Sequence, residues 1–147
     1  MGPGWGNNYL PKAGVVKRGQ GFWLKTSKAN NVKISGEVAA ANANTLNTEA
    51  NVNDILACMY PVEIDVQDIM LSNGSDGQDI LKIFDAAKGD YEDYKWFSTL
   101  YDPDHSFAPM GPGWGNNYLP KEGKILPGQG FWLKTSKANT VTIKSPL

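Results

Sequence analysis

Residues 80–97 read ILKIFDAAKGDYEDYKWF and contain two runs in which polar and apolar side chains alternate. Alternation with a period of two is the pattern of a β-strand with one buried face, so Ile80–Asp85 and Tyr91–Phe97 are predicted to be strands. The link 86–90 has the usual length of a hairpin connection, and Gly89 within it accepts a positive φ. The stretch therefore predicts an antiparallel β-hairpin.

The segments around this hairpin favour further strands. Asp54–Tyr60 is mainly apolar, stops before Pro61 and is expected to be a central strand. Gly130–Thr135 is rich in aromatic and apolar residues and Val141–Lys144 alternates, so the two are predicted to form a second hairpin. An equivalent hairpin is expected within residues 21–35, where the same pattern recurs.

Two remaining segments complete the expected fold. Ile64–Leu71 favours a short helical turn with Asp65 as its N-cap. Ser98–Gly115 contains three prolines and is expected to be a long loop, and loops of that length in a compact domain are usually functional. Together these patterns predict an all-β fold: an antiparallel β-sandwich, with a small β-barrel as the alternative, and at most one short helical turn.

A long internal repeat determines the domain organisation. Residues 1–34 recur at 110–143 with an offset of 109 and 27 of 34 positions identical, which is a domain-sized period rather than that of a solenoid. About 73 residues that precede the second copy have no counterpart before the first. Residues 1–36 are therefore interpreted as the tail of a preceding repeat in a longer array. This tail is expected to pack on a complete module at 37–147, with strand exchange with another copy as the alternative.

Composition limits the classes of partner. The net charge is -1, with 14 basic and 15 acidic side chains, which disfavours nucleic acid and anionic membranes as partners. No run approaches the ~18 apolar residues of a membrane helix. Cys58 is the single cysteine, so no intrachain disulfide is expected, and it is interpreted as a small buried hydrophobe. The abundance of Asn, Gly, Ser, Thr and aromatic residues is associated with secreted or cell-surface bacterial modules.

The loop containing Trp114 is the first candidate ligand-binding site. Trp114 lies between two glycines and is followed by Asn116, Asn117 and Tyr118. An indole with little chain beside it offers a face to the C–H groups of a sugar ring, and Asn amides supply both a donor and an acceptor for hydroxyls. Trp5 occupies the same place in the first copy. The alternative, equally weighted, is that Trp114 folds back into the core.

A second group of aromatic residues lies on the strand Tyr91–Phe97 and just beyond it. If Tyr91 and Phe97 face the core, Tyr94 and Trp96 point outward, about 7 Å apart, as a stacking platform that Tyr101 extends. The opposite assignment, with Tyr94 and Trp96 in the core, is at least as well supported by the alternation.

Few residues favour metal binding or catalysis. Asn73, Asp76 and Asp79 supply oxygen atoms for a calcium site, but their spacing departs from the EF-hand pattern, and a plain solvated loop is favoured. No catalytic residue is assigned, because His105 has no accompanying nucleophile motif and carboxylates adjacent in sequence do not form an acid–base pair. No other cofactor is expected.

Residues 38–145 resemble repeat modules in large secreted or surface proteins of gut and environmental bacteria. The motifs that carry the resemblance are Asp54–Tyr60, the Ile83-Phe84-Asp85 hairpin, the Gly113-Trp114-Gly115 loop and the closing segment 127–134. The first copy departs from the closing motif at 17–19, where it lacks the proline. The resemblance implies non-catalytic carbohydrate binding, with a plant or microbial polysaccharide as ligand. A structural repeat of a surface adhesin or fibre protein, without a small ligand, is the alternative.

Overall fold

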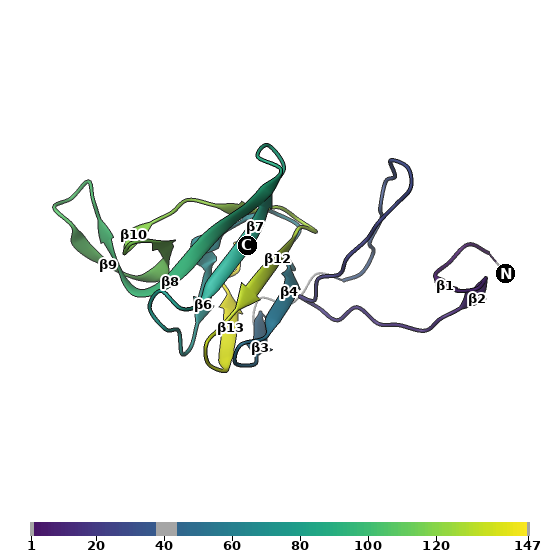
Figure 1. Ribbon diagram of the computed structural model, residues 1–147, viewed down its shortest axis with the longest axis horizontal. Helices are drawn as coiled ribbons and strands as arrows, with labels where there is room; N and C mark the ends of the chain where they lie inside the picture. The colour runs from purple at the N-terminus through teal and green to yellow at the C-terminus, as the bar shows by residue number, and fades with distance from the viewer. Residues whose placement is uncertain (1, 38–43, 147) are drawn as a thin grey trace.

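The computed structural model describes residues 2–37 and 44–146, and the chain folds into antiparallel β-sheets that do not close into a barrel. The larger sheet has six strands in the order β10-β9-β8-β7-β12-β4 (Figure 1). Its strands are β4 (Asn53–Ala57), β7 (Ile80–Asp85), β8 (Asp90–Asp102), β9 (Ala108–Asn116), β10 (Leu119–Pro120) and β12 (Gly130–Lys134). The predicted all-β class and antiparallel sandwich are confirmed.

A three-stranded sheet packs against the larger one in the order β3-β13-β6. Its strands are β3 (Thr45–Thr48), β6 (Ile69–Leu71) and β13 (Asn139–Ile143), and a small sheet pairs β5 (Ile64–Asp65) with β11 (Lys124–Ile125). Apolar side chains of these sheets meet in one buried cluster that includes Leu81, Ile83, Tyr94, Trp96, Trp114, Phe131, Leu133, Ile69, Val141 and Ile143. Burial of this cluster is the main stabilising contribution to the fold.

The hairpin predicted within residues 80–97 forms as expected. β7 pairs with β8 from Ile80↔Lys95 to Asp85↔Asp90, and Gly89 takes a φ of 69° in the turn. The predicted loop at 98–115 is wrong, because β8 continues to Asp102 and β9 pairs back along it. The three prolines do not prevent this, since Pro103 lies in the turn and the ladder is irregular between Phe97 and Tyr101.

Two predictions of strand arrangement are wrong. β4 lies at the edge of the larger sheet rather than in its centre. β12 and β13 do not pair as a hairpin, because β12 lies between β7 and β4 whereas β13 belongs to the other sheet. β12 and β13 contribute apolar side chains to the shared core from opposite sides. Because the chain crosses from one sheet to the other between them, the two strands bury more apolar surface than they would as a local hairpin.

The helical turn within 64–71 is confirmed in reduced form. Its regular part is the 3-10 turn η1 (Val66–Asp68), after which the chain continues as β6. Asp65 is the N-cap and accepts a hydrogen bond from Gln67 N, while Asp68 accepts one from Asp65 N, which completes a capping box. Within the described residues no helix has the length and apolar character to span a bilayer.

The first copy extends away from the sandwich, at the opposite end of the long axis from the β8–β9 hairpin (Figure 1). It forms a two-residue ladder between β1 (Gly6–Asn7) and β2 (Leu10–Pro11), and the strands predicted within 21–35 are absent from its described residues. Among its described residues, a short stretch meets the module: Gly21 N donates to Ile55 O (2.9 Å), Ala57 N donates to Gly19 O (2.9 Å), and the ring of Trp23 lies 5.8 Å from that of Trp132. This stretch lies along the open edge of β4.

Candidate functional site

Trp114 is a core residue, and its predicted role as an exposed stacking ring is wrong. Its exposed fraction is 0% and its indole Nε1 donates to Ile69 O (2.7 Å), which links the two sheets. Gln67 accepts from Trp114 N (2.8 Å) and donates to Trp114 O (2.6 Å), so one amide holds the backbone on both sides. The indole of Trp114 has no open face, because the glycines on either side of it allow neighbouring residues to pack closely. A Cβ on Gly113 would lie 2.4 Å from Gln67 Oε1.

Tyr94 and Trp96 are also buried, with exposed fractions of 4% and 3%, so the outward stacking platform is wrong. The side chains of Trp96 and Trp114 come from paired positions on β8 and β9, and their rings pack edge to face at 5.3 Å. Such a pair contributes about 0.5–1.5 kcal/mol beyond its buried area. This contact fixes the inward face of β8, which alternation within the strand leaves open.

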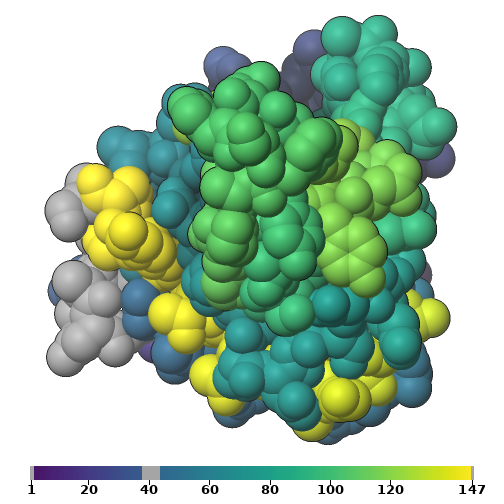
Figure 2. All heavy atoms as spheres, turned by 90° about the vertical axis from the view of Figure 1, so that its left-hand side faces the viewer, coloured from purple at the N-terminus to yellow at the C-terminus, as the bar shows by residue number. Residues whose placement is uncertain are grey.

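The remaining predicted residues meet at the surface. Asn117 and Tyr118 form the two-residue turn between β9 and β10, with φ of 49° and 65°, and Asn116 precedes them. Tyr101 lies beside this turn, since its N donates to Tyr118 O (2.9 Å). We name the hairpin surface as Tyr101, Phe107, Met110, Asn116, Asn117 and Tyr118, all exposed. In Figure 2 the β8–β9 hairpin stands out as a ridge from this face of the molecule.

Two aromatic residues of the hairpin surface have a strained backbone. Tyr118 and Phe107 have positive φ values of 65° and 54°, a region that costs residues other than glycine about 1–2 kcal/mol. Tyr118 packs over the outer face of Phe97, with ring centroids 4.4 Å apart, yet remains about half exposed. Backbone strain of this kind is often found at ligand-binding and active sites.

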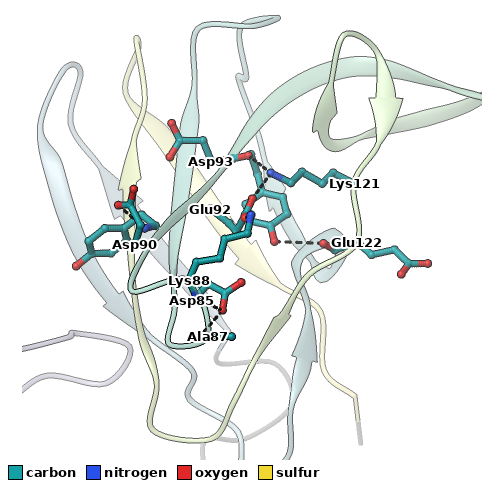
Figure 3. Close-up of polar contacts among 10 residues, drawn as sticks. Asp85, Ala87, Lys88, Asp90, Glu92, Asp93, Lys121 and Glu122 are labelled. Carbon is teal, nitrogen blue, oxygen red and sulfur yellow. Dashed lines mark hydrogen bonds and ion pairs between the residues drawn. The ribbon is translucent and has the colours of Figure 1, made fainter.

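An open groove of about 380 Å³ is a second concave feature, lined by Phe84, Asp85, Tyr94, Lys124, Leu126 and Gln129 among others. Asp85 accepts a hydrogen bond from Ala87 N (2.9 Å), whereas Glu92 is in ion pairs: it contacts Lys88 and lies 2.7 Å from Lys121 Nζ (Figure 3). Lys124 Nζ lies 3.2 Å from Asp65 Oδ2, and this hydrogen bond raises the pKa of Lys124. The groove therefore presents mainly paired charges to a ligand.

The hydroxyl of Tyr94 lies at the base of this region and is held in place. It donates to Glu122 O (3.2 Å), and Lys121 Nζ lies 4.7 Å above the ring. Burial, followed by the negative charges of Asp85 and Asp65, raises the pKa of Tyr94. The phenol therefore stays protonated and acts as a structural donor.

The loop considered as a calcium site, for which a plain solvated loop is the favoured interpretation, is held by hydrogen bonds within the protein. Asp79 is fully buried and accepts from Ser75 N (2.6 Å) and from Ser136 N (2.7 Å) and Oγ (3.0 Å). Asp76 accepts from Ser98 N (2.7 Å) and Oγ (3.1 Å). The backbone N of Asn73 donates to Asn139 Oδ1, and its backbone O accepts from Asn139 Nδ2. Among the residues that the structure describes, no cluster of three or more His, Cys, Asp or Glu is arranged for a metal ion.

Trp5 lies in the same local turn as Trp114 but in a different environment. Gly6↔Pro11 and Asn7↔Leu10 repeat the register of Gly115↔Pro120 and Asn116↔Leu119, and Asn8 and Tyr9 repeat the positive φ values. Trp5 is nevertheless 77% exposed, because no head segment covers it. The two loops fold alike locally and present different surfaces.

Sequence reasoning missed Phe107, Met110 and Gln67. Phe107 and Met110 fall in the stretch interpreted as a loop, and pairing of β8 with β9 is needed to bring them beside Tyr101. Gln67 carries no local signal for its role, since its partner Trp114 is 47 residues away. Comparison of the chain with protein families, curated proteins and solved structures found no match.

Proposed function

We propose that this chain is a non-catalytic module that binds a polysaccharide through the hairpin surface. The observation that supports this best is the grouping of Tyr101 and Tyr118 with the amides of Asn116 and Asn117 at one exposed end of the molecule. Aromatic rings pack against the C–H faces of sugars, and amides orient hydroxyl groups by offering a donor and an acceptor together.

The position and strain of this surface add support. It lies at the opposite end of the long axis from residues 2–37, so chain entering the module does not cover it (Figure 1). The positive φ of exposed Tyr118 is retained in the equivalent Tyr9. Because the hairpin surface contains no charged side chain, binding is expected to be modest and little affected by salt.

Affinity electrophoresis against a panel of plant polysaccharides tests the proposal. We expect retardation of the full chain by at least one polymer, lost in Tyr118→Ala and Tyr101→Ala, and little changed between low and high salt. Tyr9→Ala is the matched control, since it alters the same turn in the copy without a neighbouring Tyr101 equivalent. Thermal melting of each variant separates lost binding from lost folding. Absence of retardation by every polymer, or unchanged retardation in both Tyr101 and Tyr118 variants, would contradict the proposal.

A structural repeat of a surface adhesin or fibre protein is the second candidate. This candidate is favoured by the burial of Trp96 and Trp114, because rings packed in the core cannot stack on a sugar. The electrophoresis panel distinguishes the two candidates, because the hairpin surface contains no tryptophan and both candidates keep Trp96 and Trp114 buried. The structural repeat predicts no retardation by any polysaccharide in that panel.

A further inference from the structure

The repeated segment has a defined task in the complete module. We name residues 44–109 the head and residues 110–143 the closing segment. The closing segment supplies β12 between β7 and β4, and β13 between β3 and β6. It also supplies buried Trp114, Phe131 and Leu133. Neither sheet is continuous without it, so the head requires a closing segment to form this core.

The first copy contains nearly every buried side chain that this task requires. The two copies differ at seven positions, and six of these are exposed or half-buried in the closing segment. The one difference in the core is Val16 in place of Ile125, which removes a single carbon. The other buried side chains of the closing segment are identical in the first copy, at Trp5, Phe22, Leu24, Thr26, Asn30, Val32 and Ile34.

Buried polar contacts with the head are repeated as well. Thr135 Oγ1 lies 2.9 Å from Thr48 Oγ1, and Asn139 Oδ1 accepts from Asn73 N (2.7 Å). Thr26 and Asn30 are the identical residues of the first copy. Replacing the closing segment with the first copy would therefore leave these buried head groups with their partners.

The first copy already has the local turns of a closing segment. Lys17 N donates to Gln20 Oε1 at 2.9 Å, and Leu126 N donates to Gln129 Oε1 at the same distance. Gly19 and Gly128, within these turns, have φ values of 73° and 75°. Together with the matching β1–β2 and β9–β10 turns, these contacts reduce the conformational entropy lost on docking.

The chain path allows the first copy to reach the head of its own molecule. Ile143 N donates to Asn44 O (3.0 Å), so the end of the closing segment lies beside the start of the head. If Ile34 took the place of Ile143, nine residues would connect it to Asn44. Nine residues span up to about 30 Å, several times the spacing of paired strands. Gly19–Gly21 already pair along the open edge of β4, the strand that neighbours β12 in the sheet.

We infer that residues 2–34 are a second closing segment, able to replace residues 110–143 on the head of the same chain. The displaced segment would leave from Met110, which is exposed at the β8–β9 hairpin. The second copy occupies the head in this structure, and the extra carbon of Ile125 favours it over Val16 by a factor on the order of ten or less. The two closures are therefore alternative states of one monomer. Exposed Trp5 and Phe22 are unused core side chains of the second state.

Aspartate substitutions in the full chain test the exchange. Leu133→Asp places a charge in the core and disables the second copy, Leu24→Asp disables the first, and the double variant disables both. Leu126→Asp is the matched control, since it makes the same change at an exposed position of the second copy. Thermal melting, mass in solution and hydrogen exchange by mass spectrometry are measured on each, and the substitution distinguishes peptides of the two copies by mass.

We expect Leu133→Asp to melt cooperatively as a monomer of 16.0 kDa, with a midpoint lowered by roughly 5 °C relative to Leu126→Asp. Its peptides from 20–26 become protected and those from 129–135 lose protection. Leu24→Asp melts like the unmodified chain, and the double variant has no cooperative transition. The inference is overturned if Leu133→Asp is as unfolded as the double variant, if it folds without protection of 20–26, or if it folds only as a dimer.

Discussion

Substitution of Gln67 by alanine is the sharpest test of how the two sheets are joined. Gln67 follows the capped start of η1, and its amide faces the backbone of β9. It donates to Trp114 O (2.6 Å) and Lys121 O (3.2 Å) and accepts from Trp114 N (2.8 Å). Gln67→Ala removes all three bonds. Because Gln67 lies in the head, neither closing segment compensates for its loss.

The expected cost follows from what is left unpaired. Trp114 is fully buried, so its N–H loses its side-chain acceptor without access to water. A buried backbone group without a partner costs about 1–3 kcal/mol, and the lost bonds to Trp114 O and Lys121 O add a smaller amount because Gln67 is only half-buried. We expect a loss of about 2–4 kcal/mol from a domain whose total stability is of order 5–15 kcal/mol.

Urea unfolding, followed by far-UV circular dichroism, measures this loss. With an m-value near ~1–1.5 kcal/mol/M, the midpoint should fall by about 2 M. Gln78→Ala is the control, because it truncates an exposed glutamine in the same head. A difference between the two variants below about 0.5 kcal/mol would refute the role given to Gln67, since it would mean that the buried groups of Trp114 are satisfied without it.

Three further predictions concern buried groups of the head. Asp79→Asn should cost about 2–3 kcal/mol in thermal melts, because the amide turns one donor toward the donors of Ser75 and Ser136; a melt like that of the unmodified chain would rule this out. Burial, followed by Glu49, raises the pKa of Asp54 above 3.8, so its charge destabilises the fold above the folded-state pKa and not below pH ~3.8. Asp54→Asn should therefore raise the melting midpoint at pH 7 and not at pH 3, and equal shifts at both would contradict this. Burial also raises the pKa of the Cys58 thiol, so iodoacetamide should label it slowly until the domain unfolds, whereas rapid labelling of folded protein would show that the thiol is accessible.

Sequence patterns correctly predicted those features that depend on interactions between residues close together in the chain. The β7–β8 hairpin follows from alternation and Gly89, and the capped turn at Asp65 follows from its N-cap residue. The turn at Asn117 and Tyr118 forms identically in the first copy, where no head is packed against it. Each of these features depends on residues within a few positions of one another.

The inward face of β8 and the positions of β4 and β12 depend on partners far away in sequence. A period of two separates Tyr91 and Phe97 from Tyr94 and Trp96 without saying which pair is inside. The contact of Trp96 with Trp114, 18 positions later, decides it, and Tyr118 then covers Phe97 from the outside. The candidate site therefore differs from the predicted one: the turn residues and Tyr101 are exposed, whereas the larger rings belong to the core.

The hydrogen bonds between Asn44 and Ile143 also determine how the module responds to tension. Asn44 Nδ2 donates to Ile143 O (2.9 Å), so chain enters and leaves the module at neighbouring positions on the antiparallel pair β3 and β13. A pulling force applied there acts across the ladder and opens its bonds one pair at a time, as in a zipper, instead of loading them together in shear. The module should therefore open from this corner at low force, while β7, β8 and β9 bear none of the load until β13 has separated.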